Sequence, residues 1–264
     1  MFSIELKRAF SRLSFKIAIS IGIVFCILSI VKIPMYGGDI LDNYIKGFVG
    51  TPFEHFIFFK ANPISNLLII IMPIISTLGY SDSYIEDFKS GMIKGIYTRQ
   101  NKRRYLLSKY FANFIAGGAA FALPLVLNYV TLILIYPSVQ PNMVFGGTSI
   151  MPNGLLSNLF YGHANLYIIM WIAIYFLYSG AFASIALCFS TIIKNKFVVI
   201  FIPFILYILV EGFCELFNKI EYSPQTFLYL SMNKNFYAIL LEFILIFMIT
   251  ISLFFFGGVK DEVY

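Results

Sequence analysis

The chain has very little charge, and this scarcity defines its broad class. Only 12% of its 264 residues are Asp, Glu, Lys or Arg, whereas soluble domains carry roughly 25%. Hydrophobic residues make up 59% of the chain. This composition predicts a membrane protein. The net charge of +6 needs no nucleic acid to explain it, because multi-pass membrane proteins concentrate Lys and Arg in their inner loops.

Reactive side chains are also scarce, which argues against catalysis and metal binding by this chain. His55 and His163 are isolated, and Cys26, Cys188 and Cys214 lie far apart, so neither type shows metal or disulfide spacing. The sequence contains no G-x-S-x-G or H-E-x-x-H motif, and no G-x-x-x-x-G-K-[ST] phosphate loop. We therefore expect no catalytic residue, no metal and no cofactor on this chain. A membrane-embedded enzyme or assembly factor stays an alternative.

Long apolar runs dominate the rest of the sequence. A helix needs roughly 20 apolar residues to cross the hydrocarbon core of a bilayer, and backbone in lipid must satisfy its own hydrogen bonds. The first run follows basic residues up to Lys16 without a small-x-small cleavage site, so we expect a retained span rather than a signal peptide. The sequence predicts one all-α transmembrane domain over residues 1–264, with six spans at about 15–33, 64–80, 105–135, 165–193, 197–218 and 237–257.

The distribution of basic residues predicts the orientation of these spans. With the N-terminus inside, fourteen of the nineteen Lys and Arg residues fall on the inner side and five on the outer side. The positive-inside rule therefore places both termini in the cytoplasm. Residues 2–14 alternate apolar and basic side chains near helical spacing, which favours a helix lying in the inner membrane interface. A charged flank that only orients the first span is the simpler alternative.

Acidic residues are nearly absent from the predicted spans. Glu211, Glu215 and Glu242 lie near predicted outer ends, and ion-coupled carriers usually need buried charges to bind their ions. An ion-driven secondary transporter is therefore the third-ranked reading.

Small residues are grouped in two of the expected spans. The fourth contains "YSGAFASIALCFS" and the third contains "FIAGGAAFA". Small-xxx-small spacing lets helix backbones approach closely. We expect these segments to pack inside the bundle.

Residues 80–109 interrupt the apolar chain with a segment of two different halves. In the first half, apolar side chains recur near helical spacing and acidic ones fill the intervening positions, which predicts an amphipathic helix over 82–95. The second half, "TRQNKRRYLLSK", is strongly basic and suits binding to anionic lipid. The acidic first half does not suit such lipid, so it favours docking of a protein partner.

The whole chain resembles the permease subunits of type 2 ABC (ATP-binding cassette) exporters. That family has an interfacial elbow helix, six spans, and a coupling helix after the second span. The matching pattern in this chain consists of Glu86, Gly91, Thr98, Arg99, Arg103, Tyr105 and Lys109. A second match is "IIKNKFVVIFIPF" after a fourth span rich in small residues.

This resemblance implies partners and residue roles. Two permeases, identical or homologous, would pair with two cytosolic ATPase subunits that bind ATP and Mg. Tyr84, Glu86, Asp87, Phe88 and Gly91 would dock the ATPase, and Arg99, Arg103 and Arg104 would anchor the loop at inner membrane lipid. The substrate path would run along the second and fifth spans, with Asn66, Ser76, Phe201, Phe204 and Tyr207 as candidates.

The resemblance also implies a location and a class of cargo. The protein would be a multi-pass protein of a bacterial cell membrane. A path rich in Phe, Ile and Tyr would suit an amphipathic or apolar cargo better than a sugar. Small permeases of this kind often serve export of, or immunity to, antimicrobial peptides.

Overall fold

The computed structural model describes residues 1–31, 51–59, 62–141, 150, 156–219, 222–230 and 236–260, and this part of the chain contains helices and no strand. The helices are α1 (Phe2–Ser11), α2 (Leu13–Val31), α5 (Pro63–Leu78), α6 (Ser83–Lys89), α7 (Met92–Arg99), α8 (Lys102–Ile135), α9 (Ser157–Gly162), α10 (Ala164–Phe189), α11 (Lys196–Leu216), α12 (Pro224–Phe227) and α13 (Phe236–Lys260).

Six helical segments are long and apolar enough to cross a membrane. They are Leu13–Val31, Pro63–Lys89, Lys102–Ile135, Ala164–Phe189, Lys196–Leu216 and Ile239–Gly258. The described residues therefore confirm the predicted all-α fold with six helices able to span a membrane. The second segment extends past the predicted limit at residue 80 because α6 follows α5 after a short turn.

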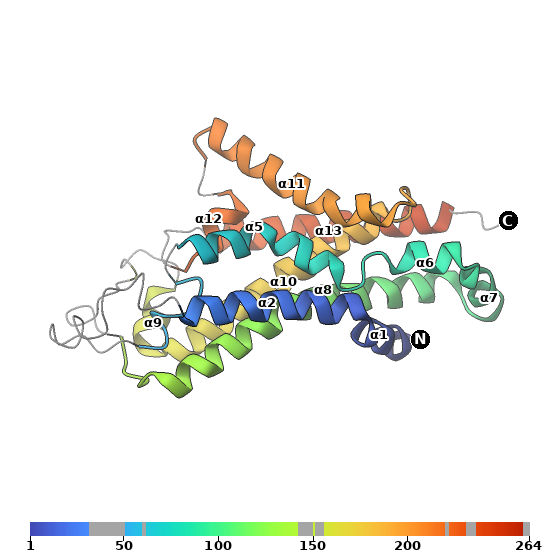
Figure 1. Cartoon of the computed structure of the whole chain (residues 1–264). Coiled ribbons are helices and arrows are strands. Elements are labelled where there is room, and N and C mark those ends of the chain that lie inside the picture. The colour runs from blue at the N-terminus through green and yellow to red at the C-terminus, as the bar shows by residue number, and fades with distance from the viewer. Residues whose placement is uncertain are drawn as a thin grey trace.

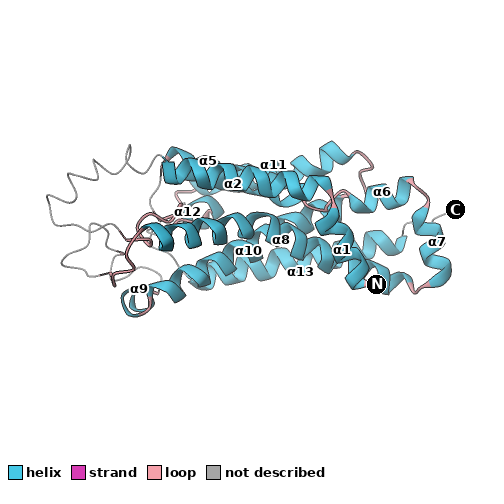
Figure 2. Ribbon diagram, turned by 60° about the horizontal axis from the view of Figure 1, so that its bottom comes forward, coloured by secondary structure: helices cyan, strands magenta, loops and turns pink. Residues whose placement is uncertain are grey.

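The long helices lie side by side, with short helices at both ends of the bundle (Figures 1 and 2). We call the end that carries α1, α6 and α7 the hairpin end, and the end that carries α9 and α12 the loop end. The N-terminus lies at the hairpin end (Figure 1).

Helix α10 is the centre of the packing, since it contacts α8, α13, α5 and α11. Small residues allow this close approach, as the sequence predicts. A Cβ atom added at Gly117 of α8 would lie 2.3 Å from the Ala183 Cβ of α10, and one at Gly180 would lie 2.8 Å from the Phe114 carbonyl oxygen. Neither position accepts a larger side chain without moving a helix.

Three helices turn most of their apolar surface outward. Helices α2, α11 and α13 bury only a minor part of their most apolar segments. Their exposed side chains include Leu13, Phe213 and Leu241. Such exposure would be costly in water but matches the hydrocarbon of a bilayer.

Asparagine side chains fix the start of three of the long helices. The Asn62 Oδ1 accepts hydrogen bonds from the backbone N–H groups of Ile64 and Ser65 at the start of α5. Asn101 and Asn195 cap α8 and α11 in the same manner, through the second residue of each helix. These caps satisfy amide groups that the first helical turn leaves unpaired.

Two breaks shape the hairpin end. Arg12 has extended backbone angles (φ −70°, ψ 144°) and separates α1 from α2. Gly91 has a φ of +70°, a left-handed conformation that favours glycine. The segment expected as one helix over 82–95 is therefore two helices, α6 and α7, and the break lies at Gly91 while Gly95 lies inside α7.

Candidate functional site

A cluster of charged side chains joins α1, α6 and α8 at the hairpin end. We call it the charged cluster, and it consists of Glu5, Arg8, Arg12, Tyr80, Asp82, Glu86, Asp87, Tyr105 and Lys109. Its members come from segments that are far apart in the sequence. Its geometry therefore depends on the tertiary fold.

Lys109 is the centre of the charged cluster. Its side chain is 0% exposed and forms ion pairs with Glu5 of α1, at 3.2 Å, and with Asp87 of α6. The Nζ atom also lies 5.2 Å from the ring centroid of Tyr80 and 5.5 Å from that of Tyr105. A fully buried ammonium is tolerated only when carboxylates and hydrogen bonds compensate for lost water. Lys109 thus holds α1 and α6 together from its place in α8.

Asp87 receives donors from both neighbouring helices. Its Oδ1 accepts a hydrogen bond of 2.7 Å from Arg8 Nη2, and its Oδ2 accepts one of 2.7 Å from the Tyr105 hydroxyl. The same Oδ2 pairs with Lys109. With a side chain only 1% exposed, Asp87 has its acceptor capacity filled inside the protein.

Glu5 completes the inner part of the cluster. Its carboxylate accepts a hydrogen bond of 3.0 Å from Arg8 Nη1 and one of 2.6 Å from the Tyr80 hydroxyl. Glu5 and Arg8 lie three residues apart on α1 and so share one face. The hydrogen bond to Asp87 raises the pKa of the Arg8 guanidinium above its ordinary value. Two carboxylates and two cations therefore balance each other in the buried part of the cluster.

Arg12 forms the outer edge of the charged cluster. Its Nη1 donates a hydrogen bond of 2.7 Å to Asp82 Oδ1, and its Nη2 pairs with Glu86. The guanidinium lies 5.2 Å from the ring centroid of Tyr80. The Glu86 side chain is 50% exposed, so this pair is reached by solvent and contributes at most about 1 kcal/mol.

Helix α6 is also held by helices outside the charged cluster. Tyr84 packs edge-to-face on Phe254 of α13, with ring centroids 5.7 Å apart. The Lys194 Nζ, between α10 and α11, lies 4.2 Å from the ring centroid of Phe88. Ile85 packs with Ala186 of α10 and Val199 of α11. Helix α6, which is only seven residues long, thus contacts α1, α8, α10, α11 and α13.

The buried part of the charged cluster ties three helices together. Each of its acids and bases is paired with another side chain. Removing one partner of such a pair typically costs about 3–5 kcal/mol. A displacement of α6 that keeps these pairs intact must also move α1 and α8.

The structure divides the residues expected to dock a partner. Tyr84 and Asp87 are buried, Phe88 is half-buried under Lys194, and Glu86 and Gly91 are exposed. Of these five residues, only Glu86 and Gly91 are therefore accessible to a partner in this conformation. Docking itself stays a prediction.

The other predicted residues fall in two places. Arg99, Arg103 and Arg104 are exposed at the hairpin end. Of the expected path residues, Asn66 and Phe201 are exposed and Phe204 is half-buried, while Ser76 and Tyr207 are buried. Ser76 donates its hydroxyl to the Met72 carbonyl of its own helix, and the Asn66 amide oxygen accepts a hydrogen bond from Tyr229.

The central role of Lys109 and its partners on α1 was not predicted from the sequence. Lys109 was named only in the pattern shared with the permease family, and Arg8 was included only among the basic residues of segment 2–14. A signal was present, because Lys109 lies inside the apolar run from 105 to 135 and a lysine in such a run usually needs a buried partner.

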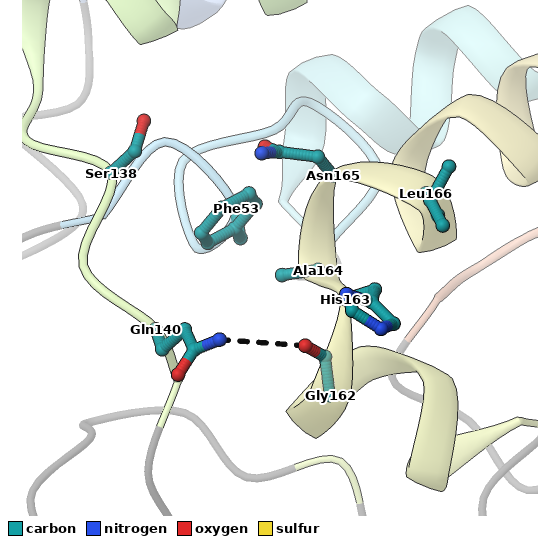
Figure 3. A pocket seen from close by; sticks show the side chains of 8 residues that line it. All are labelled: Phe53, Ser138, Gln140, Gly162, His163, Ala164, Asn165 and Leu166. Atoms are coloured by element: carbon teal, nitrogen blue, oxygen red, sulfur yellow. Dashed lines mark hydrogen bonds between the residues drawn. The ribbon is translucent and has the colours of Figure 1, made fainter.

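The loop end contains a pocket of about 240 Å³. Figure 3 shows Phe53, Ser138 and Gln140 facing the start of α10, where Gln140 donates a hydrogen bond of 3.4 Å to the Gly162 carbonyl. None of the lining residues is an Asp, Glu, Lys or Arg. In the part of the chain that the structure describes, no group of three His, Cys, Asp or Glu residues could hold a metal ion.

The chain matches no protein-family model, no curated protein and no solved structure.

Proposed function

We propose that this chain is the transmembrane permease subunit of an ABC exporter. Two copies, or one copy and a homologous permease, would pair with two cytosolic ATPase subunits that bind ATP and Mg. Energy released on the ATPase would drive export of an amphipathic or hydrophobic molecule, such as an antimicrobial or toxin-like peptide. The permease itself would carry no catalytic residue.

The observation that carries this proposal is the way in which α6 is held. Its inner side is fixed by Asp87, Tyr84 and Ile85 to helices from the whole bundle. The other side, with Glu86 and Lys89, is exposed and leads to the exposed turn at Gly91. A partner bound to this exposed side would push on a helix that is already joined to most of the spans.

The charge of the hairpin end supports an orientation toward the cytoplasm. Most of the basic residues of the chain lie on this side, as expected for the inner face of a bacterial cell membrane. Arg99 is the last residue of α7, and Arg103 and Arg104 lie in the first turn of α8. All three are exposed. They would bind anionic headgroups, with about 1 kcal/mol from each basic residue.

The turn between α6 and α7 offers the sharpest docking test. Met92 is 47% exposed directly after Gly91, and Glu86 is exposed one helical turn before the end of α6. Neither belongs to the buried part of the charged cluster. Substitutions there should disturb a partner without unfolding the permease.

We would purify the protein from native membranes in mild detergent and identify bound subunits by mass spectrometry. We expect an ABC ATPase in the wild-type complex, and an about tenfold loss of ATPase, corresponding to 1.4 kcal/mol, with Met92→Asp or Glu86→Lys. Glu215→Lys, an exposed acid at the loop end, is the matched control. An unchanged ATPase content in both hairpin variants, or ATP hydrolysis by the permease alone, would contradict the proposal.

A further inference from the structure

Two glutamates near the loop end differ from the buried acids of the charged cluster because no cation pairs with them among the residues that the structure describes. Glu211 lies in α11 and Glu242 in α13, both within segments that could cross a membrane. Both are partly buried. Within the described residues, neither forms an ion pair or a hydrogen bond through its side chain.

An unneutralised carboxylate in such a place is costly. Ionised groups inside membrane segments require several kcal/mol of compensation, and those that persist usually face a bound ligand or a pathway. The chain can neutralise buried charge, as Lys109 shows at the other end. Within the described part of the chain no cation pairs with Glu211 or Glu242, and this points to a cation supplied by a bound molecule.

Tyr207 supplies a second and independent observation. Its side chain is 2% exposed, and its hydroxyl has no hydrogen-bond partner among the described residues. A buried hydroxyl without a partner costs about 1–3 kcal/mol. Tyr207 precedes Glu211 by one helical turn and so shares its face of α11. On α10, Phe182 packs on Tyr207 and Tyr178 packs on Phe243, the neighbour of Glu242 in α13, so α10 links the helices that carry the two acids.

The aromatic residues of this region have other contacts. Phe182 of α10 packs edge-to-face on Tyr207, with ring centroids 5.6 Å apart. Tyr178 donates its hydroxyl to the Ile239 carbonyl, and Tyr229 donates to Asn66. Their donors are thus occupied, and they add apolar ring surface near the two acids.

The available groups match an organic cation. An alkyl ammonium carries three N–H donors, and the site offers two carboxylates and one phenol oxygen as acceptors. Aromatic rings add attraction for cations. A metal ion fits less well, since no group of three His, Cys, Asp or Glu in the described chain has the required geometry.

We propose that Glu211, Glu242 and the Tyr207 hydroxyl bind a positively charged amine or guanidinium group of the transported molecule. Exposed apolar residues of α11, including Phe201, Ile205 and Phe213, lie along the same helix and would contact the apolar body of such a molecule. This inference rests on the proposed transport function and narrows its cargo to cationic amphipathic molecules.

The test uses the full-length permease in nanodiscs of neutral phosphatidylcholine, without the ATPase. Two fluorescent probes of equal length are compared, a dansyl-labelled long-chain primary amine and its neutral acetamide. We expect wild type to bind the amine about tenfold more tightly than the acetamide, a difference of 1.4 kcal/mol. Glu211→Gln and Glu242→Gln should each reduce this preference, and Tyr207→Phe should weaken amine binding to a smaller extent.

Glu86→Gln is the matched control, since Glu86 is an exposed acid at the opposite end of the bundle and this assay contains no ATPase. It should leave the preference unchanged. Equal affinity of wild type for both probes, or a preference that survives in both single glutamate variants, would overturn the proposal. Each variant is first checked for a wild-type unfolding midpoint, and the two independent glutamate variants decide the question if one of them fails to fold.

The probe assay and the ATPase assay can fail separately. Amine selectivity without a co-purifying ATPase would leave the cation site standing and refute the exporter. A bound ATPase without amine selectivity would support the exporter and refute the cation site.

Discussion

The two ends of this molecule treat buried acids in opposite ways. At the hairpin end, Glu5 and Asp87 are each surrounded by cations and tyrosine hydroxyls. At the loop end, Glu211 and Glu242 have no such partner within the described chain. Buried carboxylates thus connect helices at the hairpin end and are candidate ligand groups at the loop end.

The two tyrosines beside these acids show the same difference. Tyr105 donates its hydroxyl to Asp87, whereas the buried hydroxyl of Tyr207 has no partner among the described residues. Completed networks make an element rigid, and incomplete ones are common where something else binds. We infer that movement enters at the hairpin end through a rigid connection and acts on a cargo site near the loop end.

The largest expected effect comes from Lys109→Met. This substitution leaves two buried carboxylates with Arg8 as their main counterion, which should cost about 3–5 kcal/mol. A thiol-reactive dye can follow thermal unfolding, because Cys26 and Cys188 are buried in the folded protein. We expect a clearly lower midpoint for Lys109→Met.

Lys89→Met is the control for this experiment, because Lys89 is an exposed lysine of α6 at the same end of the bundle and exposed substitutions usually change stability by less than about 0.5 kcal/mol. Equal midpoints for the two variants would show that the charged cluster does not hold the hairpin end together.

The positions of the long apolar helices could be predicted from the sequence because they depend on local composition. Long apolar runs such as residues 105–135 must become helices in lipid, and Gly117 and Gly180 must permit close packing. These properties are visible without knowing any tertiary contact.

The orientation of individual side chains on α6 could not be predicted in this way. Asp87 looks like a member of a solvent-facing polar stripe. It faces inward because Lys109, which lies 22 residues later, and Arg8, which lies 79 residues earlier, meet it in space. A helix of seven residues has too few turns for its own pattern to determine its buried face, so tertiary partners decide it.

An intermediate effect is expected when one charge is removed at each end. Glu5→Gln weakens hydrogen bonds to Arg8 and Lys109 and should destabilise the protein by about 2 kcal/mol. Glu242→Gln removes a charge that has no partner in the described part of the chain, so the midpoint should stay the same or rise. If Glu242→Gln were as destabilising as Glu5→Gln, the contrast between the two ends would disappear.

The smallest expected effect, and the sharpest for the comparison, comes from deleting one hydroxyl at each end. Tyr105→Phe removes a hydrogen bond of 2.7 Å to a charged acceptor and should cost about 1.5 kcal/mol. Tyr207→Phe removes a buried hydroxyl without a partner, so it should be neutral or stabilising by up to about 1 kcal/mol. Each kcal/mol shifts the unfolding midpoint of a protein of this size by roughly 2–4 °C.

The two variants should therefore move the midpoint in opposite directions, or move it only for Tyr105→Phe. A loss of stability in Tyr207→Phe would mean that this hydroxyl has a structural partner, and the argument for a cation site would lose its independent support.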